Sequence, residues 1–273
     1  MPLKSGWIYR LQSKYSSSSP MEVQFQSKAS PDSLFRPAID RLIPAPRVVV
    51  VCIFVIHAIL RFGGMWNAQY IALSMVVIWP LPWLLSARQA RRKMGFRAPQ
   101  SWQWFVIGSV LTIVLLAFCA AMGWLFFGET NSNWFTRHAM ALHEALKQVP
   151  AGASLITQFW IVTLPAMIFS PLAEEFLYRG FILTAFSMRW GCRTAMAIQA
   201  SAFALVHLAH YGLNPFQPAL ISIWLPSMFI TALVFGWIVQ KSRSVWPAVV
   251  SHSIFNLGMN EIVFLLLPQF IGE

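Results

Sequence analysis

Long apolar stretches alternate with short polar segments along most of the chain. A helix that crosses a membrane needs about 20 apolar residues, whereas a strand of a membrane barrel needs about 10 residues of alternating polarity. The pattern therefore predicts an all-α fold, a polytopic bundle of about seven or eight transmembrane helices. The expected spans are residues 48–64, 66–85, 102–127, 151–188, 194–210, 217–240 and 245–267.

The stretch 151–188 is too long for a simple crossing and contains Pro165 and Pro171. Splitting it into two crossings would move Lys241 and Arg243 to the side of the membrane away from the other basic blocks. We therefore expect one crossing here, entered through a kink or a surface helix near the two prolines.

Composition supports a membrane protein, with 57% hydrophobic residues, 11% charged residues and a mean hydropathy of +0.59. The net charge of +11 comes from basic blocks beside the apolar stretches, so it indicates cytoplasmic flanks and no nucleic-acid partner. We expect an integral membrane protein, in a bacterial inner membrane, with a cytoplasmic amino terminus. The basic blocks are Arg88 to Lys93, Arg189 with Arg193, and Lys241 with Arg243.

The chain divides into four parts by composition. Residues 1–47 hold seven Lys or Arg against three acids and a serine run, which predicts a basic, disordered cytoplasmic arm. Residues 48–150 supply the first helices and an exterior loop, residues 151–267 form a core with unusual polar residues, and residues 268–273 are a tail.

Two adjacent carboxylates, Glu174 and Glu175, lie inside the apolar stretch with Arg179 close behind. In a helix, Glu175 and Arg179 are four residues apart and can pair on one face, while Glu174 points about 100° away. Ionisable residues in a span are costly and usually functional, although a pair that only braces the bundle is an alternative. The second glutamate favours chemistry over bracing.

Two later spans add polar residues that can face the same cavity. His207 follows Phe203 by four residues late in one span, and His252 and Asn256 have the same spacing in the last span. Convergence of Glu, His and His-Asn from three spans exceeds what packing needs and predicts a polar catalytic cavity.

Water activation for amide hydrolysis fits these residue types. A desolvated Glu174 makes an effective general base, and His207 can hold the same water or relay its proton. His252 and Asn256 would then donate hydrogen bonds to the developing oxyanion.

Other protease mechanisms fit less well. No aspartate follows Asp40, so an intramembrane aspartyl pair is excluded. The string 152–155, Gly-Ala-Ser-Leu, lacks the last glycine of a rhomboid-like Gly-x-Ser-Gly and is expected to start a helix. In the string that begins at His143 and Glu144, Lys147 replaces the second histidine of the zinc-protease signature. We expect no cofactor, but a zinc ion held by Glu174, His207 and His252 stays an alternative, because those ligand types suit the metal.

These motifs together resemble the CPBP family, which contains the type II CAAX prenyl endopeptidases and bacteriocin-processing proteins. The resemblance covers about residues 151–267. The family's EExxxR motif matches Glu174, Glu175 and Arg179, FxxxH matches Phe203 and His207, and HxxxN matches His252 and Asn256. Ala232 and Gly236 match the small-residue motif before HxxxN, with Ala232 replacing a glycine, and predict a close helix contact.

The resemblance implies an intramembrane endopeptidase of the metal-independent glutamic type, acting on a membrane-associated protein or peptide in the lipid bilayer. A prenylated CAAX carboxyl terminus is one substrate that it implies. The alternative is a non-catalytic immunity, peptide-binding or scaffold protein that uses the same polar network. A proton-coupled transporter has little support, because the sequence shows no internal repeat.

Overall fold

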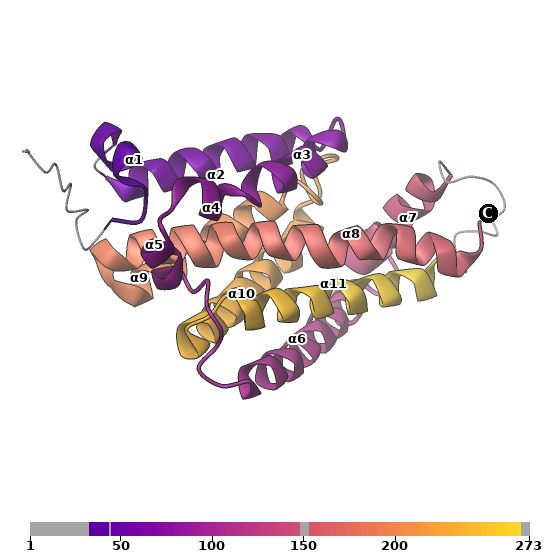
Figure 1. Cartoon of the computed structure of the whole chain (residues 1–273). Helices are drawn as coiled ribbons and strands as arrows, with labels where there is room; N and C mark the ends of the chain where they lie inside the picture. Colours follow the sequence, from indigo (N-terminus) through magenta and orange to yellow (C-terminus); the bar gives the residue numbers. More distant parts are fainter. Residues whose placement is uncertain (1–32, 44, 148–152, 269–273) are drawn as a thin grey trace, which may run out of the picture.

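The computed structural model describes residues 33–43, 45–147 and 153–268, and these residues form a bundle of helices without a β-strand (Figure 1). The all-α prediction is confirmed. The helices are α1 (Pro37–Leu42), α2 (Pro46–Gly63), α3 (Gln69–Ile78), α4 (Leu81–Leu85), α5 (Arg88–Lys93), α6 (Gln103–Phe127), α7 (Trp134–Leu146), α8 (Leu155–Glu175), the π-helical η1 (Phe176–Ile182), α9 (Leu183–His207), α10 (Pro218–Ser242) and α11 (Trp246–Leu266).

Five helical runs of the described residues are long and apolar enough to cross a membrane. A shorter apolar run, Gln69–Leu85, corresponds to the second predicted span. Each of the seven predicted segments therefore falls on helical structure, while the number of crossings stays a prediction. The five long runs are Pro46–Gly63, Gln103–Phe127, Leu155–His207, Pro218–Ser242 and Trp246–Leu266.

The longest run, Leu155–His207, reverses at Gly191. This residue has φ 78° and ψ 167°, a backbone conformation that breaks the helix and that glycine adopts without steric cost. The two arms return side by side, because Nε2 of His207 lies 3.6 Å from a carboxylate oxygen of Glu174. This reversal brings the FxxxH motif back beside the EExxxR motif.

The sequence predicted a kink or surface helix near Pro165 and Pro171, but α8 continues through both. Pro171 has no N–H to offer the carbonyl of Met167, four residues earlier. Ser253 of α11 donates its hydroxyl to that carbonyl at 2.6 Å. A side chain of the last helix thus occupies the acceptor that the proline leaves, and α11 is held against α8 beside the glutamates.

Helices α9 and α10 approach closely at the predicted small-residue patch. A Cβ added to Gly236 would lie 2.7 Å from the sulfur of Met196 and 2.9 Å from Nε2 of Gln199. Gln199 also donates a hydrogen bond of 2.9 Å to the carbonyl of Ala232. The expected close contact around Ala232 and Gly236 is therefore present.

Most of the predicted disordered arm, residues 1–32, lies outside the described residues. The prediction is wrong for the part that the structure describes, because Leu34 and Phe35 are buried and α1 follows them. Phe35 stacks on Phe181 with ring centroids 5.9 Å apart. Burial of these apolar side chains favours order in this segment despite its basic surroundings.

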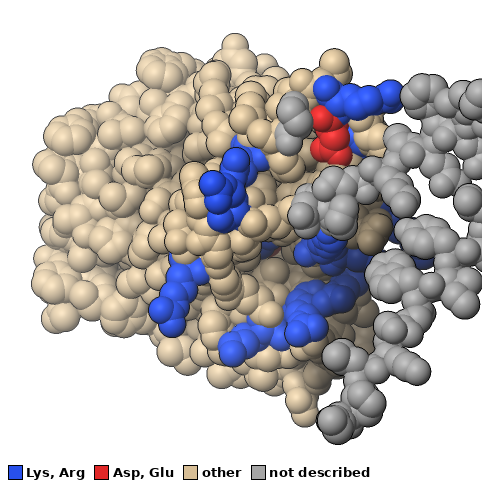
Figure 2. Space-filling model, turned by 90° about the vertical axis from the view of Figure 1, so that its left-hand side faces the viewer, with Lys and Arg blue, Asp and Glu red and all other residues tan. Residues whose placement is uncertain are grey.

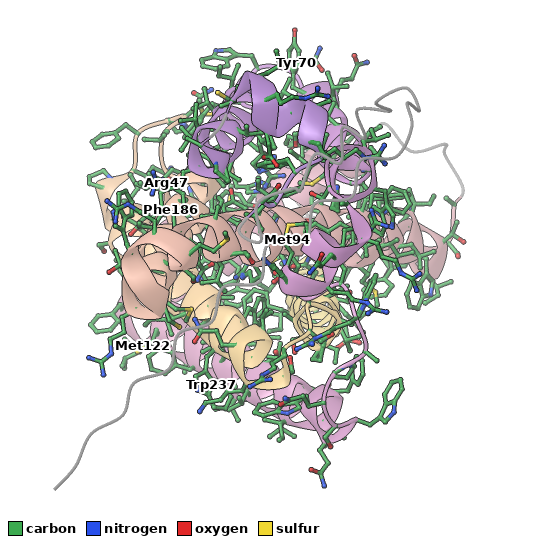
Figure 3. All side chains as sticks on the ribbon, turned by 60° about the vertical axis from the view of Figure 1, so that its left-hand side comes forward. Arg47, Tyr70, Met94, Met122, Phe186 and Trp237 are labelled. Atoms are coloured by element: carbon green, nitrogen blue, oxygen red, sulfur yellow. The ribbon has the colours of Figure 1, made fainter. Side chains whose placement is uncertain are left out.

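Lys and Arg side chains gather over one end of the bundle, which faces the viewer in Figure 2. Helix α5, the reversal at Gly191 and the turn between α10 and α11 all lie at this end. Arg47 of α2 lies near Phe186 of α9 here (Figure 3), with its guanidinium 5.6 Å from the ring centre of Trp190. We call this the basic end.

Candidate functional site

Glu174, in the last turn of α8, is buried with an exposed fraction of 1%. Its Oε1 accepts a hydrogen bond of 3.0 Å from Ser170, one turn earlier on α8, and lies 3.6 Å from Nη2 of Arg61. Its Oε2 has no hydrogen-bond partner and lies 3.6 Å from Nε2 of His207 and 4.0 Å from Nε2 of His252. One oxygen is held in place while the other faces two imidazoles.

Glu175 has a different environment from its neighbour. Its Oε1 lies 2.9 Å from Nη1 of Arg179, as the spacing predicted, and also 2.9 Å from Nδ1 of His252. Aromatic rings surround the Arg179 guanidinium, with the centre of the Phe203 ring at 4.6 Å and that of Phe235 at 5.5 Å. Glu175 and Arg179 are fully buried, so this ion pair holds the Nδ1 side of the His252 ring in place.

His207 is fixed by contacts on two sides. Its Nδ1 is 2.7 Å from the carbonyl of Phe203, and its ring stacks on the Phe203 ring at a centroid distance of 4.1 Å. Trp224 of α10 donates a hydrogen bond of 2.9 Å to the backbone carbonyl of His207. Phe203, which the motif predicted as structural support, orients both His207 and Arg179.

Asn256 lies one turn after His252 on α11 and is also at the site. Its Nδ2 donates to the carbonyl of Ala166 on α8 at 2.8 Å. An amide nitrogen carries two hydrogens, so this bond leaves a second donor. Asn256 thus joins α11 to α8 and keeps donor capacity at the cavity that it lines.

The structure brings Glu174, Glu175, His207, His252 and Asn256 together, as the sequence predicted, and adds Arg61 from α2. Arg61 is 2% exposed, and its Nη2 also makes a hydrogen bond with His210. The sequence analysis assigned no role to Arg61 or to His57, four residues earlier. That i, i+4 pair of polar residues in an apolar stretch was the pattern that could have identified them.

A cavity of about 770 Å³ extends from Glu174, His207 and His252 between α3, α8, α10 and α11. The volume falls within the range of pockets that bind small ligands, about 300–1,000 Å³. Apart from the site residues its walls are mainly apolar, with Met75 and Phe169 among them. The arrangement can therefore hold an apolar molecule with its polar group beside Glu174.

The two rejected protease strings lie elsewhere. Ser154 caps the start of α8 by accepting a hydrogen bond from the N–H of Thr157, so the string is a helix start as predicted. Lys147 makes an ion pair of 2.7 Å with Glu144 on the surface of α7 and lowers the pKa of that carboxyl. Within residues 33–43, 45–147 and 153–268, no group of three or more His, Cys, Asp or Glu is spaced to hold a metal ion.

Comparison with known proteins identifies one family. Residues 156–258 match the family described as type II CAAX prenyl endopeptidase Rce1-like. No curated protein gives a significant match to the chain. No solved structure does so either.

The predicted family resemblance is confirmed for this stretch, which contains the glutamates, both site histidines and Asn256 but not Arg61. Together with the five long apolar runs, the match supports an integral membrane protein with an intramembrane endopeptidase segment of the general CAAX type.

Proposed function

We propose that this membrane protein, whose residues 156–258 match the Rce1-like family, hydrolyses a peptide bond of a membrane-associated protein with water activated by Glu174. The observation that carries the proposal is the Oε2 atom of Glu174. It is buried, has no hydrogen-bond partner, and is faced by Nε2 of two histidines. A water molecule between these three atoms would lie beside a general base, and hydrogen bonds would fix its orientation.

The histidine tautomers support this arrangement. A carbonyl and a carboxylate can only accept, so Nδ1 of His207 donates to Phe203 and Nδ1 of His252 donates to Glu175. In a neutral ring the other nitrogen, Nε2, is then an acceptor. Water has two protons, so it can donate one to Oε2 of Glu174 and the other to Nε2 of one of these histidines, which directs a water lone pair toward a substrate carbonyl.

In the proposed reaction, Glu174 removes a proton from this water as the oxygen attacks the carbonyl carbon of the peptide. The C–N bond then breaks, the amine leaves with the proton that Glu174 returns, and a carboxylic acid remains. General-base catalysis of this kind contributes about 10²–10⁴-fold. Glu175 and Arg179 take no direct part and hold His252.

The oxyanion role changes from the one expected from sequence. Because neutral His252 accepts at Nε2, it suits water orientation better than donation to an oxyanion. Asn256 keeps a free N–H, and Arg61 supplies a cation 3.6 Å from Glu174. We assign oxyanion stabilisation to these two residues.

The cavity walls support a class of substrate. A mainly apolar cavity of about 770 Å³ suits an apolar peptide segment or a peptide that carries a lipid, and a prenylated carboxyl terminus is one such substrate. The basic end supports a cytoplasmic amino terminus by the positive-inside rule. We retain the bacterial inner membrane as the proposed location.

The direct test is cleavage of a panel of prenylated and unmodified membrane-peptide reporters by the purified protein in detergent, with and without a chelator. We expect cleavage that a chelator leaves unchanged, because the proposed base is a carboxylate. Loss of cleavage on chelation, restored by zinc, would replace the glutamic mechanism with a metal-dependent one. Binding of a reporter without cleavage would favour the immunity or scaffold function.

Arg61 provides a further prediction. We expect Arg61→Gln to lower kcat by about 100-fold, the loss typical when one oxyanion-stabilising donor is removed, with a smaller change in KM. Arg61→Lys should recover part of kcat, because it keeps the charge but loses the planar fork. Steady-state kinetics with the preferred reporter measures both.

Arg47→Gln is the matched control for Arg61→Gln. Arg47 is on the same helix, but it lies at the basic end, where its guanidinium packs over Trp190. A cation–π contact at an exposed site contributes only about 0.5–1 kcal/mol, so kcat should not change. If a folded Arg61→Gln protein keeps the wild-type kcat, Arg61 of α2 does not contribute to catalysis.

A further inference from the structure

A second group of polar side chains lines the cavity away from Glu174. It consists of His138 on α7, Tyr211 between α9 and α10, and Asn260 on α11. None of the three is part of the EExxxR, FxxxH or HxxxN motif. Figure 1 shows α7 at the end of the bundle opposite to α5. We call these three residues the distal cluster.

Two helices give the distance from the distal cluster to the proposed base. Asn260 follows His252 by eight residues on α11, which is about 12 Å at 1.5 Å per residue. Its Nδ2 donates to Oγ1 of Thr163 at 3.2 Å, and Thr163 precedes Glu174 by eleven residues on α8, which is about 16 Å. The cluster is therefore too far from Glu174 to act on the reacting atoms, and it can contact only another part of a bound molecule.

His138 and Tyr211 leave one hydrogen-bond donor unused. Nδ1 of His138 makes a hydrogen bond with the hydroxyl of Tyr211, and Nε2 is buried without a hydrogen-bond partner. If the neutral ring carries its hydrogen on Nε2, Tyr211 donates to Nδ1 and the Nε2–H is unused. If the hydrogen is on Nδ1, it is donated to Tyr211, and the hydroxyl hydrogen is left for another acceptor. Either tautomer therefore leaves a donor for a molecule in the cavity.

Asn260 and Arg137 add to this donor character. The amide nitrogen of Asn260 carries two hydrogens, and the bond to α8 uses one of them. Arg137, also on α7, lies near enough for its positive charge to act on Tyr211. Among the described residues that line the cavity, Glu174 is the one acid. The distal cluster therefore suits a negatively charged acceptor, whereas an amine would need acceptors.

Aromatic packing holds the distal cluster in position. The ring of Tyr211 meets that of Trp224 edge to face with centroids 5.4 Å apart, and the Trp224 ring lies 4.8 Å from that of Trp134 on α7. Trp134 and Asn260 are each 1% exposed. Side chains that are fixed before binding lose little conformational entropy when a ligand arrives. The donors are therefore preorganised.

We propose that the distal cluster is a specificity subsite that binds a carboxylate of the substrate, while Glu174 acts on a peptide bond about 12–16 Å away. The inference rests on the proposed function and adds a chemical requirement, an apolar peptide with one negative group at this distance from the scissile bond. The carboxylate comes either from a free carboxyl terminus or from the side chain of Asp or Glu, since both present the same two oxygens.

Binding to the Glu174→Gln protein tests the subsite without requiring cleavage. The full chain is purified in detergent, and fluorescence anisotropy measures the affinity of labelled apolar peptides of one sequence. One peptide ends in a free carboxylate and one in a carboxamide. Other peptides, all with a carboxamide end, carry Glu or Gln at one position, which is moved along the sequence.

We expect the carboxylate to bind at least about tenfold more tightly than its neutral match in one of the two sets, because hydrogen bonds to a charged acceptor are the stronger ones. A preference between the two ends would identify the chain terminus as the source. A preference for Glu over Gln at one position would identify a side chain. No preference in either set would overturn the proposal.

Two double variants show whether the distal cluster is responsible. Tyr211→Phe with His138→Phe removes the donors of the pair and keeps both rings for packing, so most of the preference should be lost. Tyr70→Phe with His143→Phe makes the same changes off the cavity wall and should keep it. A preference that survives in the first double variant would refute the assignment. If that variant does not fold, Tyr211→Phe alone should still lower the preference, because His138 loses the partner that orients its ring.

Cleavage by the wild-type protein separates this inference from the proposed function. If the carboxylate preference is found in binding but no peptide is cleaved, the hydrolase function fails and the subsite stands. If peptides are cleaved but bind without preference, the hydrolase function stands and the subsite fails. Where both hold, Tyr211→Phe with His138→Phe should raise KM for the carboxylate peptide and leave kcat unchanged, because the cluster lies far from the reacting atoms.

Discussion

Replacing Glu174 by glutamine should abolish cleavage while the protein still inserts and folds. Glutamine has the same shape, its carbonyl can still accept from Ser170, and its amide can donate toward His207 and His252. It cannot remove a proton from water, so kcat should fall by about 10³-fold or more. Reporter cleavage measures kcat, and thermal unfolding in detergent should show a Tm close to that of the wild type.

Glu261→Gln is the control for this substitution. Glu261 is an exposed carboxylate on α11, outside the cavity wall, so its replacement should leave kcat and Tm unchanged. Measurable turnover by a folded Glu174→Gln protein would show that another group activates the water.

Replacing Glu175 by alanine should lower both the stability of the protein and its activity. Arg179 is fully buried, and its charge would lose its partner at 2.9 Å. A buried charge left without its partner costs about 3–5 kcal/mol. His252 would also lose the acceptor of its Nδ1 proton, so activity should fall together with stability. Denaturant unfolding in detergent measures the free energy of unfolding.

A double substitution separates the two effects of Glu175. Replacing a buried ion pair by apolar residues of similar volume is often neutral, so Glu175→Leu with Arg179→Leu should recover much of the stability. Cleavage should stay low, because His252 remains without its acceptor. If the double variant is no more stable than Glu175→Ala, the two side chains act independently and the ion-pair account is wrong.

The sequence predicted the parts of the site that depend on local geometry. Four-residue spacing placed Arg179 next to Glu175 and put His252 and Asn256 on one face, because helix periodicity alone determines which side chains share a face. The apolar stretches likewise predicted the helices, since their length is set by the bilayer.

Contacts between distant segments could not be predicted in the same way. His252 meets Glu175 across 77 residues, and Arg61 meets Glu174 across more than 100, so neither contact appears in any local spacing. The role proposed for His252 depends on which ring nitrogen faces Glu175, a detail that only the fold decides. The carbonyl of Met167, which Pro171 leaves without its helical donor, likewise finds a partner in Ser253, which belongs to another helix.

The contact between Arg61 and Glu174 has a consequence for how such proteins are classified. The family match begins at residue 156, whereas the guanidinium beside Glu174, the proposed base, comes from a helix that ends at Gly63. Two chains could carry identical glutamate and histidine motifs and still differ in catalytic power if their first membrane helix lacks this cation. Relatives could be grouped by whether that helix supplies an arginine. Such groups would differ in the positive charge beside the glutamate, which the shared motifs do not show.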